Sequence, residues 1–476
     1  MMNTFDNKVQ VLKFKVLSEV ARLAFSNTLL ENITEIPKTI SPGKIPTMRC
    51  CVYKERAILS ERVRLAIGGN RYNKKVIQVI DIACDDCPRG GYEVTSVCRG
   101  CLAHRCAEIC PVGAITFGND QKAYIDKTKC IECGKCASTC PYSAIMNYKR
   151  PCESSCKVQA ITMGENKEAR IDYDKCIACG ACVSQCPFGA ITDRSYILDV
   201  IDLIKSSEEG RRYRVYAMVA PAIAAQLSTV TVGQVLEAIR LLGFTDIREV
   251  AEGADLVACE EAEELARRGF LTSSCCPAFV SYIEKFFPAL AEHVSPTLSP
   301  MGMLAKRIKE ADPTAKTVFI GPCTAKKTEF QRKEYAGLVD SVITFTELQA
   351  LIAGKGIDVG TLPEYRLEDA SAFGRRLART GGLSEAICEA IRESSADFRP
   401  DPIVCSGIEE CKPALMRAAK GVLSANFIEG MACRGGCING AGSLSHSERN
   451  LKRTEDYAKA AVKKSLTGQK NSEEEP

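Results

Sequence analysis

Cysteines dominate the chemistry that this sequence can perform. The chain has 476 residues, of which 27 are Cys and only three are His, namely His104, His293 and His446. Cysteines in C-x2-C spacing favour metal or redox sites, and so few histidines leave little room for mixed Cys/His zinc sites. Thiolate-only ligation of iron–sulfur clusters fits this composition better.

The strongest pattern is a cysteine run that occurs twice. Cys130-Ile-Glu-Cys133-Gly-Lys-Cys136-Ala-Ser-Thr-Cys140-Pro141 recurs as Cys176-Ile-Ala-Cys179-Gly-Ala-Cys182-Val-Ser-Gln-Cys186-Pro187. Both follow the bacterial ferredoxin pattern, in which three thiolates hold one 4Fe–4S cluster and the fourth ligates its neighbour. A short strand signal follows each run, at 143–145 and at 189–191.

A variant of this run precedes both copies. Cys98-Arg-Gly-Cys101-Leu-Ala-His104-Arg-Cys106-Ala-Glu-Ile-Cys110-Pro111 has a wider gap before its third cysteine. This spacing is similar to that in the iron–sulfur subunits of molybdopterin oxidoreductases. We expect Cys106 to be the third ligand, with His104 as the alternative. One cluster would use Cys98, Cys101, Cys106 and Cys140, and the next would use Cys130, Cys133, Cys136 and Cys110.

The same stretch contains four more cysteines. Cys152 and Cys156 look like the end of a degenerate third repeat, and Cys84 with Cys87 would supply its missing pair. Together with Cys176, Cys179, Cys182 and Cys186 they make eight thiols, enough for two further clusters, so we expect two to four accessory clusters in all. The alternative is that Cys84 and Cys87 are free thiols or bind zinc. Adjacent Cys50 and Cys51 suit joint ligation of one cluster poorly, and we interpret them as spare or structural.

Three later motifs add cysteines at the ends of apolar runs. They are Thr272-Ser-Ser-Cys275-Cys276-Pro277-Ala-Phe279, Gly321-Pro322-Cys323-Thr-Ala-Lys326-Lys-Thr-Glu329 and Glu429-Gly-Met431-Ala-Cys433-Arg-Gly-Gly-Cys437-Ile-Asn-Gly440. In open α/β sheets, ligands bind beyond the carboxyl ends of the strands. Four cysteines from three such loops could therefore converge on one buried site.

The surrounding elements fit this arrangement. Apolar runs predict strands at 213–219, 318–320 and 425–428, and helical periodicity predicts helices at 233–242, 254–268 and 383–393. The expected organisation is a helical segment at 1–80 with a Pro-punctuated connection around 37–46, a dicluster ferredoxin-like domain at 81–150, a second cluster segment at 151–195, a catalytic domain at 196–445 and a polar tail at 446–476. That tail would be a solvated helix that ends in a frayed Ser472-Glu-Glu-Glu-Pro476.

Composition excludes several other classes. No run of 18 apolar residues is present and the N-terminal residues lack a secretory pattern, so we expect a cytoplasmic protein that does not span a membrane. The formal net charge of +4 does not indicate nucleic-acid binding, because each 4Fe–4S cluster held by four thiolates adds a charge of roughly −2 to the protein. No Rossmann fingerprint is evident, so direct use of NAD is not expected.

The three motifs, in this order and behind a ferredoxin segment, resemble the signature loops of the FeFe-hydrogenase large subunit over roughly residues 80–445. The resemblance implies an α/β catalytic domain with two lobes of parallel sheet flanked by helices, an active site in the cleft, and small α+β ferredoxin-like 4Fe–4S domains. It implies that Cys276, Cys323, Cys433 and Cys437 ligate the 4Fe–4S part of an H-cluster. Cys437 would bridge to a two-iron subsite that carries CO, cyanide and a dithiolate. The implied reaction is 2 H⁺ + 2 e⁻ ⇌ H₂, with a ferredoxin or similar soluble carrier and dedicated maturation proteins.

The same resemblance implies roles for other residues. Cys275 would pass protons to the subsite, and a lowered pKa would help this thiol. Glu261 and Glu264, on one face of a predicted helix, match the relay carboxylates, and Ser295 matches the relay hydroxyl; the alternative is two solvated glutamates. Lys326 resembles the family's hydrogen-bond donor to a cyanide ligand. The alternative is that Lys326 is a surface lysine, as we expect Lys327 to be. Glu329 would support that loop, and Met431 and Pro221 would wall the subsite.

The sequence also departs from the familiar members. Ala278-Phe279 replaces Gly-Trp, Gly321 replaces Met, Met301 replaces Gln, and Ala222 replaces a small polar residue. The motif that ends in Gly440 continues Ala-Gly-Ser-Leu, a pattern that resembles the group B branch. One alternative function is an uptake or hydrogen-sensing hydrogenase, and another is a non-catalytic iron–sulfur protein like the eukaryotic hydrogenase-like assembly factors. We expect Cys259, Cys388, Cys405 and Cys411 to be buried structural thiols.

Overall fold

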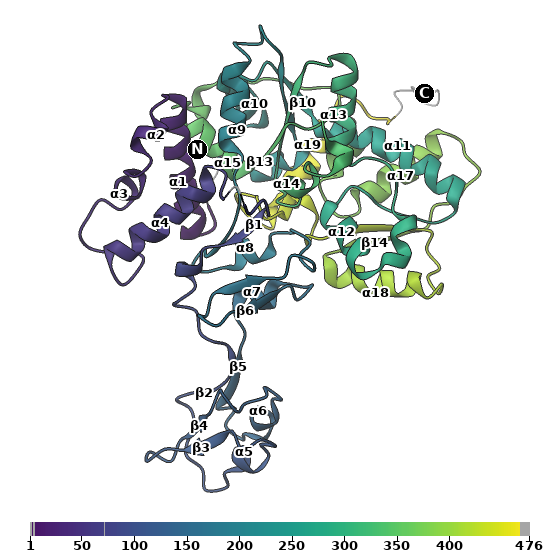
Figure 1. Ribbon diagram of the computed structural model, residues 1–476. Coiled ribbons are helices and arrows are strands. Elements are labelled where there is room, and N and C mark those ends of the chain that lie inside the picture. Colours follow the sequence, from purple (N-terminus) through teal and green to yellow (C-terminus); the bar gives the residue numbers. More distant parts are fainter. Residues whose placement is uncertain (1, 3–4, 71, 467–476) are drawn as a thin grey trace.

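The computed structural model describes residue 2, residues 5–70 and residues 72–466 (Figure 1). The expected frayed end at 472–476 lies outside this part of the chain. Across the described residues, no helix is long and apolar enough to cross a membrane.

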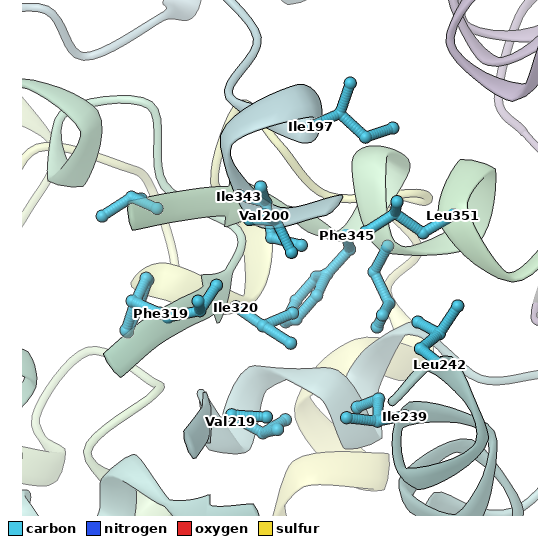
Figure 2. Close-up of a cluster of buried hydrophobic side chains, with 14 of the residues drawn as sticks. Ile197, Val200, Val219, Ile239, Leu242, Phe319, Ile320, Ile343, Phe345 and Leu351 are labelled. Atoms are coloured by element: carbon cyan, nitrogen blue, oxygen red, sulfur yellow. The ribbon is translucent and has the colours of Figure 1, made fainter. Parts of the chain in front are cut away.

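The first lobe of the C-terminal half is built on a four-stranded parallel sheet. Its order is β10-β9-β12-β13, and all pairings are parallel. The strands are β9 (Val215–Val219), β10 (Asp246–Glu249), β12 (Lys316–Gly321) and β13 (Ser341–Thr344). Every residue of β9 and β13 is buried, as expected for parallel strands that are covered on both faces. Figure 2 shows the apolar core of this lobe, where Val219, Ile320 and Phe345 meet between sheet and helices.

The second lobe contains a smaller parallel sheet. Its order is β11-β15-β14, from Leu271–Thr272, Phe427–Met431 and Pro402–Ser406. The long helix α11 (Val250–Arg268) packs against both α13 (Pro300–Ala311) and α17 (Gly382–Glu393). The predicted α/β architecture is therefore confirmed, with two parallel sheets flanked by helices.

The remaining elements of this half are short. The helices are α10 (Val232–Leu242), α12 (Pro277–Phe286), α14 (Lys326–Glu329), α15 (Phe345–Gly354), α16 (Ala372–Arg376), α18 (Ile408–Ala419) and α19 (Arg449–Lys459). The 3-10 turns are η2 (Pro221–Gln226), η3 (Pro288–His293), η4 (Lys333–Tyr335), η5 (Val359–Thr361) and η6 (Cys437–Asn439). A helix does form after residue 446, as predicted, but it was wrong to expect it to be solvated on all sides. Helix α19 packs on η2 and α16, and it buries Asn450, Thr454 and Ala458.

Two ferredoxin-like units are nested in the chain. In the first, which we call the arm (residues 91–148), β2 (Gly91–Val94) pairs with β5 (Ile145–Tyr148). In the second, which we call the body unit (residues 76–87 and 151–193), β1 (Ile77–Val79) pairs with β8 (Ile191–Asp193). The arm is thus inserted into a loop of the body unit, and it projects away from the rest of the molecule (Figure 1). The expected boundary at 150 had grouped Cys84 and Cys87 with the arm, whereas the strand pairing groups them with the body unit.

Both units have the same sequence of elements. The arm adds α5 (Arg105–Glu108), β3 (Ile115–Phe117), β4 (Ala123–Ile125) and α6 (Lys135–Thr139). The body unit adds η1 (Asp81–Ala83), α7 (Pro151–Ser155), β6 (Ile161–Met163), β7 (Ala169–Ile171) and α8 (Ala181–Gln185).

Helices precede the ferredoxin-like units. They are α1 (Lys8–Phe25), α2 (Leu29–Asn32), α3 (Ile36–Ile40) and α4 (Val52–Ala66), and α9 (Ile197–Ser206) follows the body unit. Helix α1 begins with an Asn7 cap and packs its apolar face, including Leu17 and Val20, against α15. The expected Pro-punctuated connection contains α3, because a proline such as Pro37 is tolerated in the first turn of a helix.

Candidate active site and cluster-binding cysteines

Three loops bring four cysteines together between the two lobes. Cys276 follows β11 and caps α12, Cys323 lies between β12 and α14, and Cys433 and Cys437 follow β15. Each loop leaves the carboxyl end of a parallel strand, which is where such sheets bind ligands. Cys323, Cys276 and Cys437 all add to the raised pKa of the Cys433 thiol, so the four side chains lie close together.

The donor chemistry of this set fits an iron–sulfur cluster. Burial, and then Cys276, raise the pKa of Cys323 to about 11, and burial raises that of Cys433 well above its usual range. Four thiolates in such a place need a cationic metal centre to compensate them. Within the described residues, no three His, Cys, Asp or Glu side chains are arranged to hold a single metal ion. A cubane, which takes one thiolate at each of four irons, suits this wider spacing.

Cys275 is buried beside the four thiols and faces a carboxylate. Burial, followed by the charge of Glu261, raises the pKa of Cys275 well above its usual range. A lowered pKa, which would have helped this thiol to exchange protons, is therefore not found, because the side chain is buried and the neighbouring charge is negative. The side chain is a neutral thiol that can donate a proton, and it regains one only from a partner.

Glu261 is the partner that the structure provides. Its Oε1 accepts hydrogen bonds from the Ser274 backbone N–H at 3.0 Å and from the Ser274 hydroxyl at 2.9 Å. Burial raises the pKa of Glu261 to about 7, although Ser274 and Ser295 oppose this shift. A carboxyl group with that pKa exchanges protons readily near neutral pH.

Glu264 lies one turn further along α11 in a different environment. It forms ion pairs with Arg267 and Arg268, and these two arginines lower the pKa of its carboxyl group. The helix thus places both glutamates on one face, as predicted, and the buried carboxylate of Glu264 is paired with the more exposed Arg267 and Arg268.

Lys326 approaches the same site from α14. Its Nζ donates to Glu329 Oε2 at 2.7 Å, to the Ser299 hydroxyl at 2.6 Å and to the Cys275 carbonyl at 3.4 Å. Burial, the largest single influence, lowers the pKa of Lys326, but Glu329, Tyr335 and Cys323 together raise it above its usual value. Pro221 and Met431, at the ends of β9 and β15, are buried as well.

The prediction that Lys327 is a surface lysine was wrong. Its side chain is fully buried and pairs with Asp193 at 2.8 Å and with Glu347 at 2.7 Å, while Lys13 also contacts Asp193. Because Asp193 lies in β8, this network ties the body unit to α14, α15 and α1.

The eight cysteines of the body unit separate into two sets of four. Cys156 lies with Cys176, Cys179 and Cys182, whose thiols raise one another's pKa values. Cys84, Cys87, Cys152 and Cys186 form the other set, because Cys87 and Cys186 add to the effect of burial in raising the pKa values of the Cys84 and Cys152 thiols. Burial, and then the neighbouring thiols, raise the pKa of Cys179, and one of those neighbours is Cys276. The first set therefore borders the cysteines of the cleft.

Close packing supports this contact. Gly180 has a φ of +77°, and a Cβ there would lie 2.5 Å from both the Ala441 Cβ and the Thr324 Oγ1. Only glycine allows the body unit to approach the catalytic loops so closely. Thr324 also donates to the Ala178 carbonyl at 2.9 Å.

A shared hydrogen bond marks the last cysteine of each run. The Sγ atoms of Cys110, Cys140, Cys156 and Cys186 each accept from the backbone N–H four residues later, at 3.2–3.4 Å. Cys156 therefore occupies the same position as the last cysteine of the complete runs, which supports the interpretation of a degenerate repeat.

The arm brings its own eight cysteines into two groups. Cys106 lies with Cys101 and Cys140, and Cys136 lies with Cys130 and Cys133. Cys98 and Cys110 pack on the same small core. His104 stacks on Phe117 with ring centroids 3.7 Å apart, so packing occupies the imidazole and the geometry favours Cys106 as the ligand.

Two buried arginines beside the body unit were not anticipated from sequence. Arg150 lies in the segment that leads from the arm back to the body unit, and it is fully buried. It donates to the Lys167 carbonyl at 2.8 Å and contacts the Cys87 thiol. Arg62, on α4, lies near Cys186, and burial lowers its pKa to about 10. Nothing in the local sequence of either arginine indicates burial.

The other cysteines have mixed environments. Cys405 and Cys411 are buried, as predicted, and their thiols share a hydrogen bond. Cys259 and Cys388 are only half-buried, so the prediction was wrong for them. The Cys51 Sγ accepts the Lys54 N–H at the start of α4, which is a structural contact.

The fold and the cysteine sets, which lead to a four-thiol cleft between two α/β lobes, define an iron–sulfur protein. Comparisons with known proteins agree with this class. The family model "Iron only hydrogenase large subunit, C-terminal domain" matches residues 213–441, "4Fe-4S dicluster domain" matches 97–144, and "4Fe-4S binding domain" matches 169–192.

Three curated relatives place the chain more closely. It is 32% identical over 380 residues to the periplasmic [Fe] hydrogenase large subunit of Nitratidesulfovibrio vulgaris, covering 67% of this chain and 85% of the relative. It is 27% identical over 311 residues to iron hydrogenase 1 of Clostridium pasteurianum, covering 54% of each. Over 90 residues it is 41% identical to the cytosolic Fe-S cluster assembly factor NAR1 of Kluyveromyces lactis, covering 19% of each. The chain belongs to the iron-only hydrogenase large-subunit family.

Proposed function

We propose that this protein is an FeFe-hydrogenase that catalyses 2 H⁺ + 2 e⁻ ⇌ H₂ in the cytoplasm. The observation that carries the proposal is the cleft, where four thiols from three loops surround a site and a fifth thiol, Cys275, faces Glu261. Cys276, Cys323, Cys433 and Cys437 would hold the H-cluster, which when bound supplies the redox chemistry of hydrogen. Dedicated maturation proteins would supply its two-iron subsite.

The chain's own residues would deliver protons and exclude water. Cys275 donates a proton towards the subsite, and Glu261 restores it. Lys326, held by Glu329 and Ser299, keeps a positive charge directed at the site and would donate to a cyanide ligand. Met431 and Pro221, both buried, wall the site.

Electrons would arrive by a separate route. A ferredoxin or similar soluble carrier would reduce the arm, and the two cysteine sets of the body unit would pass electrons to the cleft. Four accessory 4Fe–4S clusters would account for all sixteen cysteines of both units. Support comes from the contact between Cys179 and Cys276, which joins the last accessory set to the site.

Two measurements test the proposal. Infrared spectra of the matured protein should show CO and cyanide bands, and reduced ferredoxin should drive hydrogen evolution. Cys275→Ala should keep those bands but lose hydrogen evolution by about 10²-fold or more, because the proton donor is gone. Matured protein without the bands would contradict the proposal.

The second candidate is a non-catalytic iron–sulfur protein, because a NAR1 assembly factor is among the relatives. The argument against it is that this chain has Cys275, Lys326 and Met431, all of them buried, whereas a non-catalytic protein would have no use for a proton donor. An uptake or hydrogen-sensing role would show as hydrogen oxidation faster than evolution with the same carrier.

A further inference from the structure

A solvent-facing cavity of about 650 Å³ lies between the body unit and the second lobe. One wall comes from α7, α8 and the residues beside them, and the other wall comes from the start of α18 and the loops that follow β15. Lys157 on the first wall pairs with Glu409 on the second at 2.9 Å, so an ion pair joins the two walls. The volume falls within the range of small-molecule sites, which is roughly 300–1,000 Å³.

The cavity reaches two neighbouring cysteine sets from outside. Cys179 of the body unit and Cys433 of the cleft both line it, and both side chains are partly exposed. Among the described residues, no other cysteine of either set lines the cavity, so it lies outside the space that each set encloses. A molecule bound in this cavity would therefore contact one ligand of each set.

Both walls offer apolar atoms to a flat molecule. Pro151 and Ala181 line the cavity on the side of the body unit, and Ile408 and Ala432 line it on the side of the second lobe. Apolar groups on two walls favour a planar aromatic ring between them, and a few polar groups fix the orientation of such a ligand. The polar side chains available for this are Ser154, Ser184 and Asn439.

The charge of the lining is positive. Lys149, Lys157 and Arg434 line the cavity, whereas Glu409 is the one carboxylate among its described lining residues. Lys157 and Arg434 share Glu409, the latter at 3.6 Å, and Lys149 is exposed with no ion-pair partner in the described part of the chain. Because lysine and arginine side chains bind phosphate groups, the lining favours a ligand that carries one.

We propose that this cavity binds a small planar two-electron carrier that bears a phosphate group, of the flavin mononucleotide (FMN) type, and that the protein reduces this carrier with hydrogen. The proposal rests on the proposed hydrogenase function and adds a second electron acceptor, which contacts the cysteine sets without the arm. Oxidation of H₂ at the cleft releases two electrons and two protons. The electrons leave by way of Cys433 or Cys179 to the bound ring, which takes up two protons from solvent, so the balanced reaction is H₂ + FMN → FMNH₂.

The first measurement is binding without turnover. Flavin fluorescence anisotropy gives the affinity of the matured protein, under argon, for FMN and for riboflavin, which has the same ring but no phosphate. The test variant Lys149→Glu/Arg434→Glu reverses two exposed charges of the lining, and the matched control is Lys412→Glu, an exposed lysine of α18 that does not line the cavity. We expect the double variant to weaken FMN binding by about tenfold or more, with riboflavin binding and the control variant within about twofold of the parent.

The second measurement is reduction of FMN under H₂, expressed as a ratio to the reduction of a cationic viologen dye. We expect this ratio to fall by about tenfold or more in the double variant and to stay within about twofold in Lys412→Glu. Ser154→Trp, which fills the cavity from the body-unit wall, gives the same readout if the double variant fails to fold.

Three results would overturn the proposal: no binding of FMN by the parent, riboflavin bound as tightly as FMN, or FMN binding and reduction that neither cavity variant changes. Because binding needs no turnover, its result is distinct from a failure of the hydrogenase assignment, which missing CO and cyanide bands would reveal.

Discussion

The arm and the body unit share a fold and a cysteine pattern but have opposite surroundings. The body unit is held by Lys327 at Asp193, by Lys285 at the Cys176 carbonyl and by Thr324 at the Ala178 carbonyl. The arm projects away from the molecule (Figure 1), and it exposes Cys133 and large apolar side chains such as Leu102 and Ile131. Exposed apolar patches of this kind are typical of interaction sites.

The difference in surroundings indicates that the two units have different roles. Under the proposed function, the body unit would hold a cluster at a fixed distance from the cleft and is held there by buried charges, whereas the arm would meet the electron carrier and keeps its surface exposed. The two units approach each other at one point, because Glu132 adds to the effect of burial in raising the pKa of Glu153. Glu132 precedes Cys133 and Glu153 follows Cys152, so the loop that carries Cys133 lies near the helix that carries Cys152.

Removal of the arm should have the largest effect. The arm begins with β2 and ends with β5, and these two strands pair with each other, so the ends of the arm lie close together. Residues 89–149 can therefore be replaced by a short Gly-rich linker. We expect loss of the iron of two clusters and of ferredoxin-driven hydrogen evolution, with evolution from a small reduced dye retained. Iron analysis and the two assays measure this outcome. Loss of both activities would mean that the body unit cannot form without the arm.

Lys327→Met should unfold the junction of the body unit. The substitution leaves Asp193 and Glu347 buried with only Lys13 nearby, a loss of about 3–5 kcal/mol in the free energy of unfolding. Thermal unfolding followed by circular dichroism should show a lower midpoint. The matched change in the arm, Lys127→Met, removes a half-exposed contact to the Tyr92 carbonyl and should cost under about 1 kcal/mol. Equal losses of stability for both variants would show that the buried ion pairs of Lys327 contribute no more to the free energy of unfolding than an exposed contact does.

Arg150→Gln should change the reduction potential of one body cluster. The buried guanidinium lies among Cys84, Cys87 and Cys152, so its charge favours the more negative, reduced cluster. Removing about 1–3 kcal/mol of attraction lowers the potential by roughly 50–100 mV. A redox titration followed by electron paramagnetic resonance measures the shift. The control is Arg105→Gln in the arm, which should leave all potentials in place.

His104→Ala should have the smallest effect. The imidazole stacks on Phe117, so its loss removes packing but no ligand. Iron content should be unchanged, whereas Cys106→Ala should lose about one cluster. Loss of iron in the His104→Ala variant would show that His104, and not Cys106, is the third ligand of that cluster.

Local sequence patterns predicted the type of binding site better than they predicted which side chains are buried. The cysteine runs were identified by their spacing, and the cleft motifs, each continuous in sequence, were identified by their resemblance to a known family. Lys326 and Lys327 are adjacent lysines that point about 100° apart on α14, and only the packing of β8 and α15 shows that both are buried. Arg150 and Arg62 gave no signal for the same reason, since long-range contacts bury them. The raised pKa of Cys275 likewise depends on a pocket that no short motif describes.

The nested topology also fixes an order of biogenesis. As the chain leaves the ribosome, Cys84 and Cys87 emerge first, yet their partners Cys152 and Cys186 emerge only after the whole arm. A folded arm whose ends meet at β2 and β5 shortens the effective loop that must close, which lowers the entropy cost of joining those distant thiols. Insertion of metal into the outermost part of the molecule would thus precede, and promote, completion of the interior.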